Sequence, residues 1–244
     1  MVVDNGSADG SADAARGCPG VRVIESGANL GFARANNIGI RASESDLILL
    51  LNSDAVVPAG AIEALVGDLR THPEAAIVGP RILDANGRPE ISFGPMMGPF
   101  NELRQKTRGR LYQRGVRLVA ARVERMVHSA HYPDWVSGAC LLVRRTAAQE
   151  VGLLDERYFI YAEDVDFCAM VRARGHKVRF TPAAEIVHHR GRAAVKNRAQ
   201  VNEEYRRSQI AFYQKHHPAW APWLKAYLGL RGRLPRPRAG PGPS

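Results

Sequence analysis

The sequence predicts an α/β fold in which a mostly parallel central sheet is flanked by helices. Strand and helix patterns alternate through residues 2–83, as a parallel sheet requires. Residues 47–51 are aliphatic on both side-chain faces, which is typical of a strand buried between two layers of helix. With 244 residues, of which 45% are hydrophobic, the chain can form one globular domain with a small appendage.

The first predicted elements are short. Residues 2–4 form a strand that ends in a turn rich in Asn, Gly and Ser, and residues 21–24 form a second strand. A turn marked by Gly31 leads into a helix that ends near Ala42. The strand at 47–51 follows and stops at the sequence Asn-Ser-Asp. The first and third strands are therefore each followed directly by an acidic or polar residue.

The next segment continues the alternation of helix and strand. Pro58 marks a helix start, and apolar residues at helical spacing through 61–66 predict a helix that ends near His72. Residues 77–83 are predicted to form a strand, and residues 84–88 a hairpin turn with Asn-Gly at its tip.

Residues 94–131 differ in character from the rest of the chain. Glycines and prolines interrupt the regular pattern, and arginines are then interleaved with aliphatic residues. This basic amphipathic insert has two interpretations, a solvated pair of surface helices or an element that faces lipid or binds a substrate.

Regular structure returns at residues 135–143, which are predicted to form a strand. Gly138 within it would let a ligand approach the backbone closely. An acidic cluster, Tyr-Ala-Glu-Asp-Val-Asp at residues 161–166, opens a predicted helix that Gly175 ends.

The C-terminal part is predicted to contain two short strands, at residues 178–180 and 185–189, and a helix at 203–217. Residues 218–244 form a basic tail with many Pro, Gly and Arg residues. We expect this tail to be partly disordered, from Arg231 onward.

The net charge of +10 predicts an anionic partner, which would be nucleic acid, a lipid surface or a phosphorylated substrate. The three cysteines, Cys18, Cys140 and Cys168, are odd in number and far apart, so neither a disulfide framework nor a zinc site is indicated. No signal peptide is recognised, and no apolar run reaches the roughly 20 residues needed to cross a bilayer. We therefore expect a cytoplasmic protein.

Carboxylates follow strands at two places. Asp4 ends the first strand and Asp54 follows the strand at 47–51, where ligands bind in open α/β sheets. Asp54 is the first candidate metal ligand, and the alternative is that Asn-Ser-Asp is only a polar turn. The acidic cluster at 161–166 is the third site that we expect at the same edge of the sheet.

Five motifs occur in order along the chain, at residues 3–7, 29–33 with Asn37, 51–54, 135–139 and 161–166. Together they resemble the family 2 glycosyltransferases, in particular the rhamnosyltransferase-like bacterial branch, from Met1 to about Trp220. The resemblance implies a GT-A type, Rossmann-like fold in residues 1–217, with 94–131 as an insert and 218–244 as the tail. It also implies an inverting transfer from a nucleotide-diphosphate sugar, for which dTDP-rhamnose is the candidate.

The resemblance also implies how the donor is held. Asp4 resembles the carboxylate that binds the pyrimidine base, and Asp54 resembles the last carboxylate of a metal-binding Asp-X-Asp, with Asn52 at its first position. His188 resembles a histidine that completes coordination of Mg²⁺ or Mn²⁺, although it could instead be a core histidine, and His189 is its neighbour. The implied nucleotide-binding residues are Asp4, Asn5, Gly31, Phe32, Asn37 and Asn52, and the implied diphosphate-binding residues are Arg190 and Arg192.

For the acceptor side, the resemblance implies that Asp164 is the base that removes a proton from the acceptor hydroxyl. An inverting transfer needs one such carboxylate on the face opposite the leaving group. Glu163, Trp135 and Gly138 are the implied acceptor-binding residues. The alternative is that the acidic cluster only complements a helix N-terminus, where each negative charge is worth about 0.3–1 kcal/mol.

Other classes of protein fit less well. A dinucleotide-dependent oxidoreductase would need Gly-x-Gly-x-x-Gly after the first strand, which is absent. No zinc-finger spacing or RNA-binding aromatic signature is present, so we expect no nucleic-acid partner. Apolar residues of the insert and tail predict peripheral contact with the anionic inner face of the cell membrane, and a polyprenyl-linked or surface glycan as acceptor. These residues are Met96, Met97, Phe100, Trp220 and Trp223.

Only three residues precede Asp4. The resemblance implies a strand and a helix ahead of this position, so we expect the chain to be N-terminally truncated relative to the family. The alternative function that follows is a catalytically inactive fragment that binds the donor.

Overall fold

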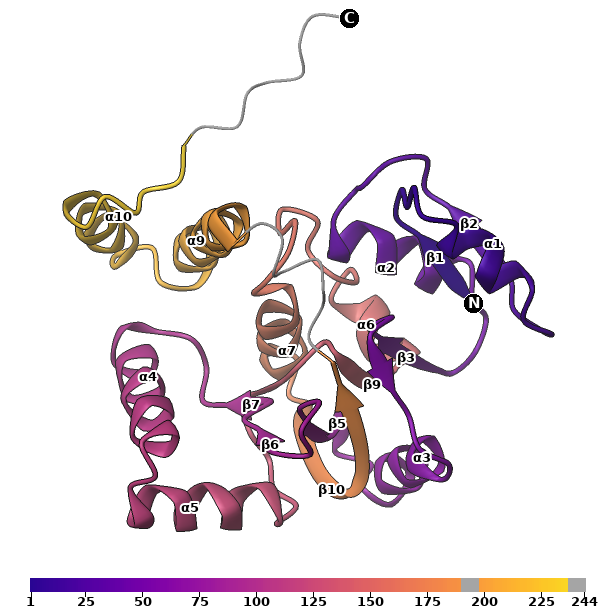
Figure 1. Ribbon diagram of the computed structural model, residues 1–244, viewed down its shortest axis with the longest axis horizontal. Coiled ribbons are helices and arrows are strands. Elements are labelled where there is room, and N and C mark those ends of the chain that lie inside the picture. The colour runs from indigo at the N-terminus through magenta and orange to yellow at the C-terminus, as the bar shows by residue number, and fades with distance from the viewer. Residues whose placement is uncertain (190–197, 237–244) are drawn as a thin grey trace, which may run out of the picture.

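The computed structural model describes residues 1–189 and 198–236 and has a central sheet with helices on both faces (Figure 1). The sheet has six strands, with β3, β9, β5, β10 and β4 side by side and β6 paired to β5. β3, β5 and β10 run in one direction, and β9 and β4 run in the opposite direction. The bounds are β3 (Leu47–Leu51), β4 (Ala55–Val56), β5 (Ala75–Leu83), β6 (Pro89–Glu90), β9 (Cys140–Arg144) and β10 (Lys177–His188).

Two further pairs of strands lie outside this sheet. β1 (Val2–Asp4) and β2 (Val23–Glu25) are parallel to each other, and β7 (Phe93–Gly94) and β8 (Trp135–Val136) are antiparallel. The predicted strand at 135–143 is thus divided into β8 and β9 by a loop around Gly138. The two strands predicted at 178–180 and 185–189 are instead parts of β10, whose register with β5 shifts between Thr181 and Glu185.

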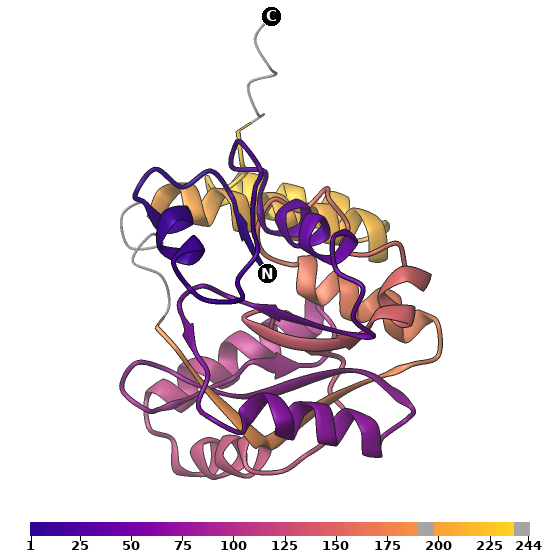
Figure 2. The ribbon, with the colours of Figure 1, turned by 90° about the vertical axis from the view of Figure 1, so that its right-hand side faces the viewer.

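Helices cover both faces of the sheet, as predicted. α3 (Ala61–Thr71) packs on one face, and α2 (Phe32–Arg41), α6 (Arg145–Glu150) and α7 (Glu163–Ala173) pack on the other (Figure 2). Ile48 and Leu50 of β3 are buried, whereas Leu51 is 39% exposed. The burial of β3 is therefore less complete than we expected, because β3 pairs with β9 alone at the end of its sheet.

The basic insert forms two helices, α4 (Pro99–Gln113) and α5 (Arg117–Val127). Val123 and Val127 of α5 are buried against the sheet core, while Phe100 and Leu103 of α4 are exposed. The remaining N-terminal helix, α1 (Ser11–Arg16), buries no residue.

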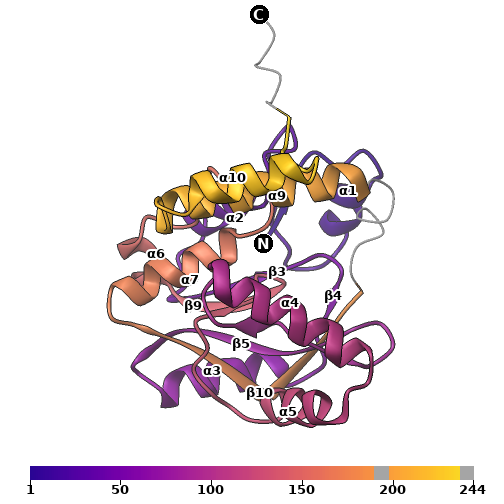
Figure 3. The same cartoon turned by 90° about the vertical axis from the view of Figure 1, so that its left-hand side faces the viewer.

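The last two helices of the described residues, α9 (Arg198–His216) and α10 (Ala221–Leu230), pack against each other (Figure 3). The tail that we expected to be partly disordered therefore begins with a helix, and residues 231–236 are described as well. No helix within residues 1–189 and 198–236 has the length and apolar character needed to span a membrane.

Candidate active site

Asp54 and His188, the two predicted metal ligands, lie next to each other. They meet because β4 pairs with the end of β10, which sets His188 opposite Ala55. His188 Nε2 is 3.1 Å from Asp54 Oδ1 and 3.4 Å from Asn52 Nδ2. The His189 amide donates to the Asp54 carbonyl at 3.0 Å. The side chain that faces Asp54 is therefore that of His188.

A second carboxylate lies on the other side of the His188 ring. Glu90 Oε2 is 4.0 Å from His188 Nδ1, while Nε2 faces Asp54. β6 positions Glu90, since this short strand pairs with β5 in the middle of the sheet. The ring thus lies between two acids, Asp54 directly before β4 and Glu90 at the end of β6.

This donor set fits a divalent metal that is shared with a ligand. In the part of the chain that the structure describes, no group of three or more His, Cys, Asp or Glu residues could hold a metal alone. Mg²⁺ usually binds through one or two carboxylates, several waters and substrate phosphates. Asp54 and His188 could supply the protein's share of such a site, and a diphosphate would supply the rest.

The end of β1 forms the second predicted part of the donor site. The buried Asp4 carboxylate accepts hydrogen bonds from the amides of Gly6 (3.2 Å) and Ser7 (3.1 Å). Hydrogen bonds from the Ser7 hydroxyl and amide hold the pKa of Asp4 below its usual range. Asp4 is therefore a carboxylate fixed in its charged form at the end of a strand.

Asn5 joins this turn to the turn before α2. Its Oδ1 accepts from the Leu30 amide at 2.8 Å, and its Nδ2 donates to Asn29 Oδ1 at 3.1 Å. Gly31 has a φ of 86°, and a Cβ there would lie 2.5 Å from the Phe159 carbonyl oxygen, so only glycine fits. The two turns that we predicted to hold the nucleotide are thus fastened to each other by side chains.

Phe32 connects these turns with the loop around Gly138. Its amide donates to the Phe159 carbonyl at 2.7 Å, and its ring would lie 3.5 Å from a Cβ at Gly138. The ring is therefore packed between α2 and the β8–β9 loop.

Asn37 forms hydrogen bonds to the loop before α7. Its side chain is 1% exposed, its Nδ2 donates to the Leu154 carbonyl (2.8 Å) and to Glu156 Oε1 (3.0 Å), and its Oδ1 accepts from the Leu154 amide (3.1 Å). These bonds fix α2 to the loop before α7, and nucleotide binding by Asn37 stays a prediction.

Asp164, the predicted base, is held by two backbone amides. Gly138 N donates to Oδ2 at 2.9 Å and Val165 N donates to Oδ1 at 2.8 Å. A Cβ at Gly138 would lie 3.2 Å from the Asp164 Cβ, so a larger residue there would have to displace Asp164 slightly. Desolvation raises the pKa of Asp164, against the effect of these amides, although its side chain keeps some exposure.

The backbone ahead of α7 is strained. Tyr161 and Ala162 have φ values of 69° and 65°, which residues other than glycine seldom adopt. Glu163 follows them, is 6% exposed, and has an Oε2 without a hydrogen-bond partner among the described residues. Burial, with a smaller contribution from the Asp164 charge, raises the pKa of Glu163 well above its usual value. Glu163 is thus a buried acid whose neutral form is favoured.

Trp135, predicted to bind the acceptor, donates its indole N–H to the Pro95 carbonyl at 2.9 Å. The ring is only half-buried, so part of it stays accessible. The predicted diphosphate-binding residues, Arg190 and Arg192, lie outside the described residues.

Asp166 has a structural role that sequence reasoning did not predict. It is 1% exposed, and its carboxylate is bound by Lys215 Nζ (2.8 Å), His216 Nε2 (2.6 Å) and the Tyr158 hydroxyl (3.2 Å). It therefore anchors α9 to α7 and does more than complement a helix N-terminus. The available signal was the Lys-His pair at the end of the last predicted helix.

Comparison with known families and relatives bears on the family of the chain. The family model described as Glycosyl transferase family 2 matches residues 1–131. The "N-acetylglucosaminyl-diphospho-decaprenol L-rhamnosyltransferase" of Mycobacterium tuberculosis (strain ATCC 25618 / H37Rv) is 34% identical, over 96% of this chain and 82% of its own length. The "Low-salt glycan biosynthesis hexosyltransferase Agl10" of Haloferax volcanii is 27% identical, over 77% of this chain and 58% of its own.

Two solved structures share the fold. GalNAc-T7 with UDP, GalNAc and Mn²⁺ has a TM-score of 0.59 and 14% identity, over 92% of this chain and 44% of that one. The mannosyltransferase PcManGT from Pyrobaculum calidifontis with GDP-Man and Mn²⁺ has a TM-score of 0.55 and 18% identity, over 94% and 59%. The predicted GT-A fold is thereby confirmed. The chain belongs to glycosyl transferase family 2.

Proposed function

We propose that this chain is an inverting glycosyltransferase that moves a sugar from a nucleotide-diphosphate sugar to a lipid-linked or cell-surface glycan. The observation that carries the proposal is that short hydrogen bonds connect the segment of Asp54, the proposed donor side, with the segment of Asp164, the proposed acceptor side. The Asn52 amide donates to the Ala139 carbonyl at 3.0 Å, and the adjacent Gly138 amide donates to Asp164. Asp54 and Asp164 thus flank one loop, as a donor diphosphate and an acceptor hydroxyl would require.

On the donor side, Asp4 and Asn5 would face the base and ribose, and Asp54 with His188 would hold Mg²⁺ or Mn²⁺. The metal, when bound, would neutralise charge on the diphosphate leaving group. The solved neighbours with Mn²⁺ and a nucleotide or nucleotide sugar support this assignment at the level of the fold. Arg190 and Arg192 stay proposed diphosphate-binding residues.

On the acceptor side, Asp164 would take the proton of the attacking hydroxyl. The hydroxyl oxygen bonds to the anomeric carbon, and the bond from that carbon to the diphosphate breaks, with its electron pair leaving on the phosphate oxygen. A raised pKa suits a general base, because proton transfer is most efficient when its pKa lies near the working pH. The amides of Gly138 and Val165 would keep the carboxylate oriented, and Glu163 and Trp135 would contact the acceptor.

Rhamnose is the proposed sugar, and a polyprenyl-linked glycan is the proposed acceptor. The support is the relative that is 34% identical, whose name specifies L-rhamnosyl transfer to N-acetylglucosaminyl-diphospho-decaprenol. We further propose that residues 1–217 form the catalytic domain, which includes the 94–131 insert, and that residues 218–244 form an attached basic segment.

Peripheral contact with the membrane is also proposed, at the inner face of the cell membrane. Phe100 of α4 and Trp220 before α10 stack with ring centroids 5.8 Å apart, and Phe100 is 75% exposed. Trp223 is 71% exposed on the same helix that exposes Leu230. Aromatic residues of this kind favour the membrane interface, and each nearby basic residue adds about 1 kcal/mol on an anionic surface.

A panel of nucleotide sugars tests the proposal. Each donor is incubated with Mg²⁺ or Mn²⁺ and a prenyl-diphosphate-linked N-acetylglucosamine, and release of nucleoside diphosphate is measured with and without this acceptor. We expect release that depends on the acceptor, and most with dTDP-rhamnose. Binding of a nucleoside diphosphate without turnover of any donor would favour the inactive donor-binding fragment instead.

A further inference from the structure

A polar stripe runs along the face of α9 that meets α4. Asn202, Arg206, Gln209 and Tyr213 follow at helical spacing, so their side chains lie on one side of the helix. In the C-terminal half of the stripe, buried Glu102 of α4 accepts from Gln209 Nε2 (2.5 Å) and the Tyr213 hydroxyl (2.7 Å). The hydrogen-bond donors in that half are therefore satisfied by a carboxylate inside the protein.

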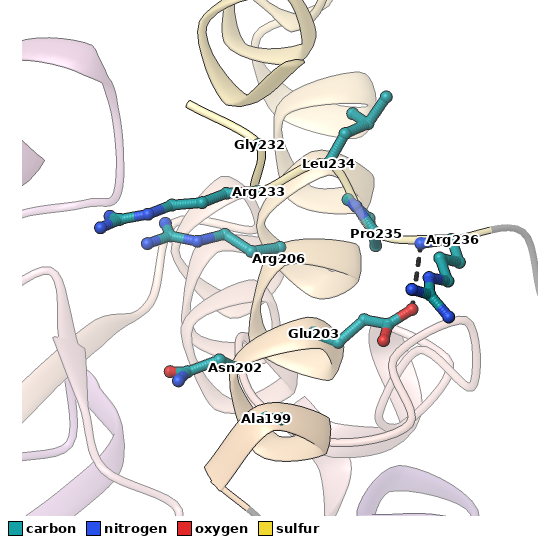
Figure 4. A pocket seen from close by; sticks show the side chains of 9 residues that line it. All are labelled: Ala199, Asn202, Glu203, Arg206, Gly232, Arg233, Leu234, Pro235 and Arg236. Atoms are coloured by element: carbon teal, nitrogen blue, oxygen red, sulfur yellow. Dashed lines mark hydrogen bonds between the residues drawn. The ribbon is translucent and has the colours of Figure 1, made fainter. Parts of the chain in front are cut away.

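The N-terminal half of the stripe has no such carboxylate. Arg206 donates to the neutral Gln209 Oε1 at 2.8 Å and lies over the Tyr205 ring at 5.2 Å. Neither Arg206 nor Arg233 forms an ion pair with any carboxylate in the two described stretches of the chain. Figure 4 shows that both guanidinium groups point to the same side of α9, as does the amide of Asn202.

These groups line a cleft of about 480 Å³ between α9 and residues 232–236. Its lining includes three arginines and one acid, Glu203. Glu203 Oε1 accepts from Arg207 at 2.6 Å and from the Arg236 amide at 3.0 Å, on the opposite side from Arg206 in Figure 4. The cleft is therefore positive where Arg206 and Arg233 meet.

The lining of the cleft is connected on one side to the segment before the proposed base and on the other to α10. The ring of Tyr205, which lies under Arg206, contacts the ring of Tyr161, with the two ring centroids 5.9 Å apart. Tyr161 is three residues before Asp164. On the other side, residues 232–236 follow α10, which exposes Trp223, Tyr227 and Leu230. A molecule with a sugar at Asp164 and a lipid chain at α10 would pass this cleft.

We propose that Arg206, Arg233 and Asn202 form a binding site for the diphosphate of a lipid-linked acceptor. Guanidinium groups bind phosphate oxygens through paired, charge-assisted hydrogen bonds, and an amide adds a further donor. A sugar, a diphosphate and a prenyl chain in series match the order of base, cleft and apolar surface. The assignment of the ligand rests on the proposed function, whereas the anion-binding site itself can be tested without it.

The first arm measures binding of inorganic pyrophosphate by calorimetry, with chelator present so that binding at Asp54 is suppressed. We expect Arg206→Gln/Arg233→Gln to weaken binding about 10- to 100-fold, as for the loss of charged hydrogen bonds. The matched control is Arg22→Gln/Arg70→Gln, which removes the same charge from two exposed sites. Equal affinity in both double variants would overturn the proposal. Arg233→Gln alone, at an exposed position, serves if the double variant melts at a lower temperature than wild type.

The second arm distinguishes an acceptor diphosphate from a lipid headgroup. Flotation is compared between neutral vesicles doped with farnesyl diphosphate and vesicles of phosphatidylglycerol without it. We expect the cleft variant to lose binding to the doped vesicles and to keep most of its binding to phosphatidylglycerol. If the cleft variant lost binding only to the phosphatidylglycerol vesicles, the diphosphate assignment would be overturned.

The two proposals can fail separately. Suppose that nucleoside diphosphate binding depends on Asp54 and metal, but that pyrophosphate binds the Arg206→Gln/Arg233→Gln variant as tightly as wild type. This result would overturn the proposed anion site and leave the proposed function standing. Pyrophosphate binding that depends on Arg206, without turnover of any nucleotide sugar, would support the cleft as an anion site and overturn the proposed function.

Discussion

The two halves of the active site are held in different ways. Asp54 and His188 are placed by paired strands, so the backbone ladder of β4 and β10 fixes their separation of 3.1 Å. Asp164 instead lies at the start of α7, behind two strained residues, and its helix is fixed by the contacts of buried Asp166 with Lys215 and His216 of α9. The donor side is thus rigid through its backbone, whereas the acceptor side depends on side chains that can be substituted one at a time.

This difference explains what the sequence could predict. Strands at 2–4, 47–51 and 77–83 are short aliphatic runs, and each is present. The continuity of β10 was missed because Pro182 and small residues interrupt its pattern where the register shifts. The division at Gly138 was missed because its amide bonds to Asp164, which lies 26 residues further along the chain.

The site shows the same contrast. Asp4 ends β1, and Asn52 and Asp54 lie in the turn after β3, so local sequence identified them as site candidates. Pairing His188 with Asp54 required the family resemblance, because 134 residues separate them. The anchor at Asp166 was missed, since its partners lie 49 and 50 residues away on a helix with no periodic signal toward α7, and the Lys-His pair at the end of that helix was the available signal.

The largest effect on stability should come from Asp166→Asn, which tests whether ionic contacts hold the acceptor side. Asp166 is buried, and removing its charge leaves the half-buried His216 without a carboxylate partner and Lys215 with Asp155 alone, so we expect a loss of about 3 kcal/mol in the free energy of unfolding. Denaturant unfolding measures it. Glu150→Gln is the matched control, because its pair with His176 is exposed and is worth about 1 kcal/mol or less. Equal losses in the two variants would mean that Asp166 is not an anchor.

Asp54→Asn tests the donor side. We expect nucleoside diphosphate to bind about 10-fold or more weakly in Mg²⁺ or Mn²⁺, and nearly as in wild type with chelator, because the lost group would be a metal ligand. Calorimetry under both conditions provides the comparison, with Asp46→Asn, an exposed carboxylate, as control. The same loss with and without metal would exclude Asp54 as a ligand.

Glu163→Gln should give a smaller effect that depends on pH. The raised pKa of Glu163 means that the folded chain holds its proton more tightly than the unfolded chain. The stability that it contributes is therefore full below the ordinary pKa and is lost as pH rises toward the folded value. Glutamine does not titrate, so only wild type loses this stability as pH rises. The melting temperature of the variant minus that of wild type should therefore increase by a few degrees between about pH 5 and about pH 8. A difference that stays constant over this range, as we expect for the exposed Glu44→Gln, would contradict a buried neutral Glu163.

The central claim is that Asp164 acts on the acceptor and Asp54 on the donor, and Asp164→Asn tests it most directly. Turnover with the best nucleotide sugar and nucleoside diphosphate affinity with metal are measured on the same preparation. We predict that turnover falls about 10²- to 10⁴-fold, as for loss of a general base, while affinity stays within a few-fold of wild type. Equal losses of turnover and affinity would make Asp164 a structural residue and contradict the division of the site into two halves.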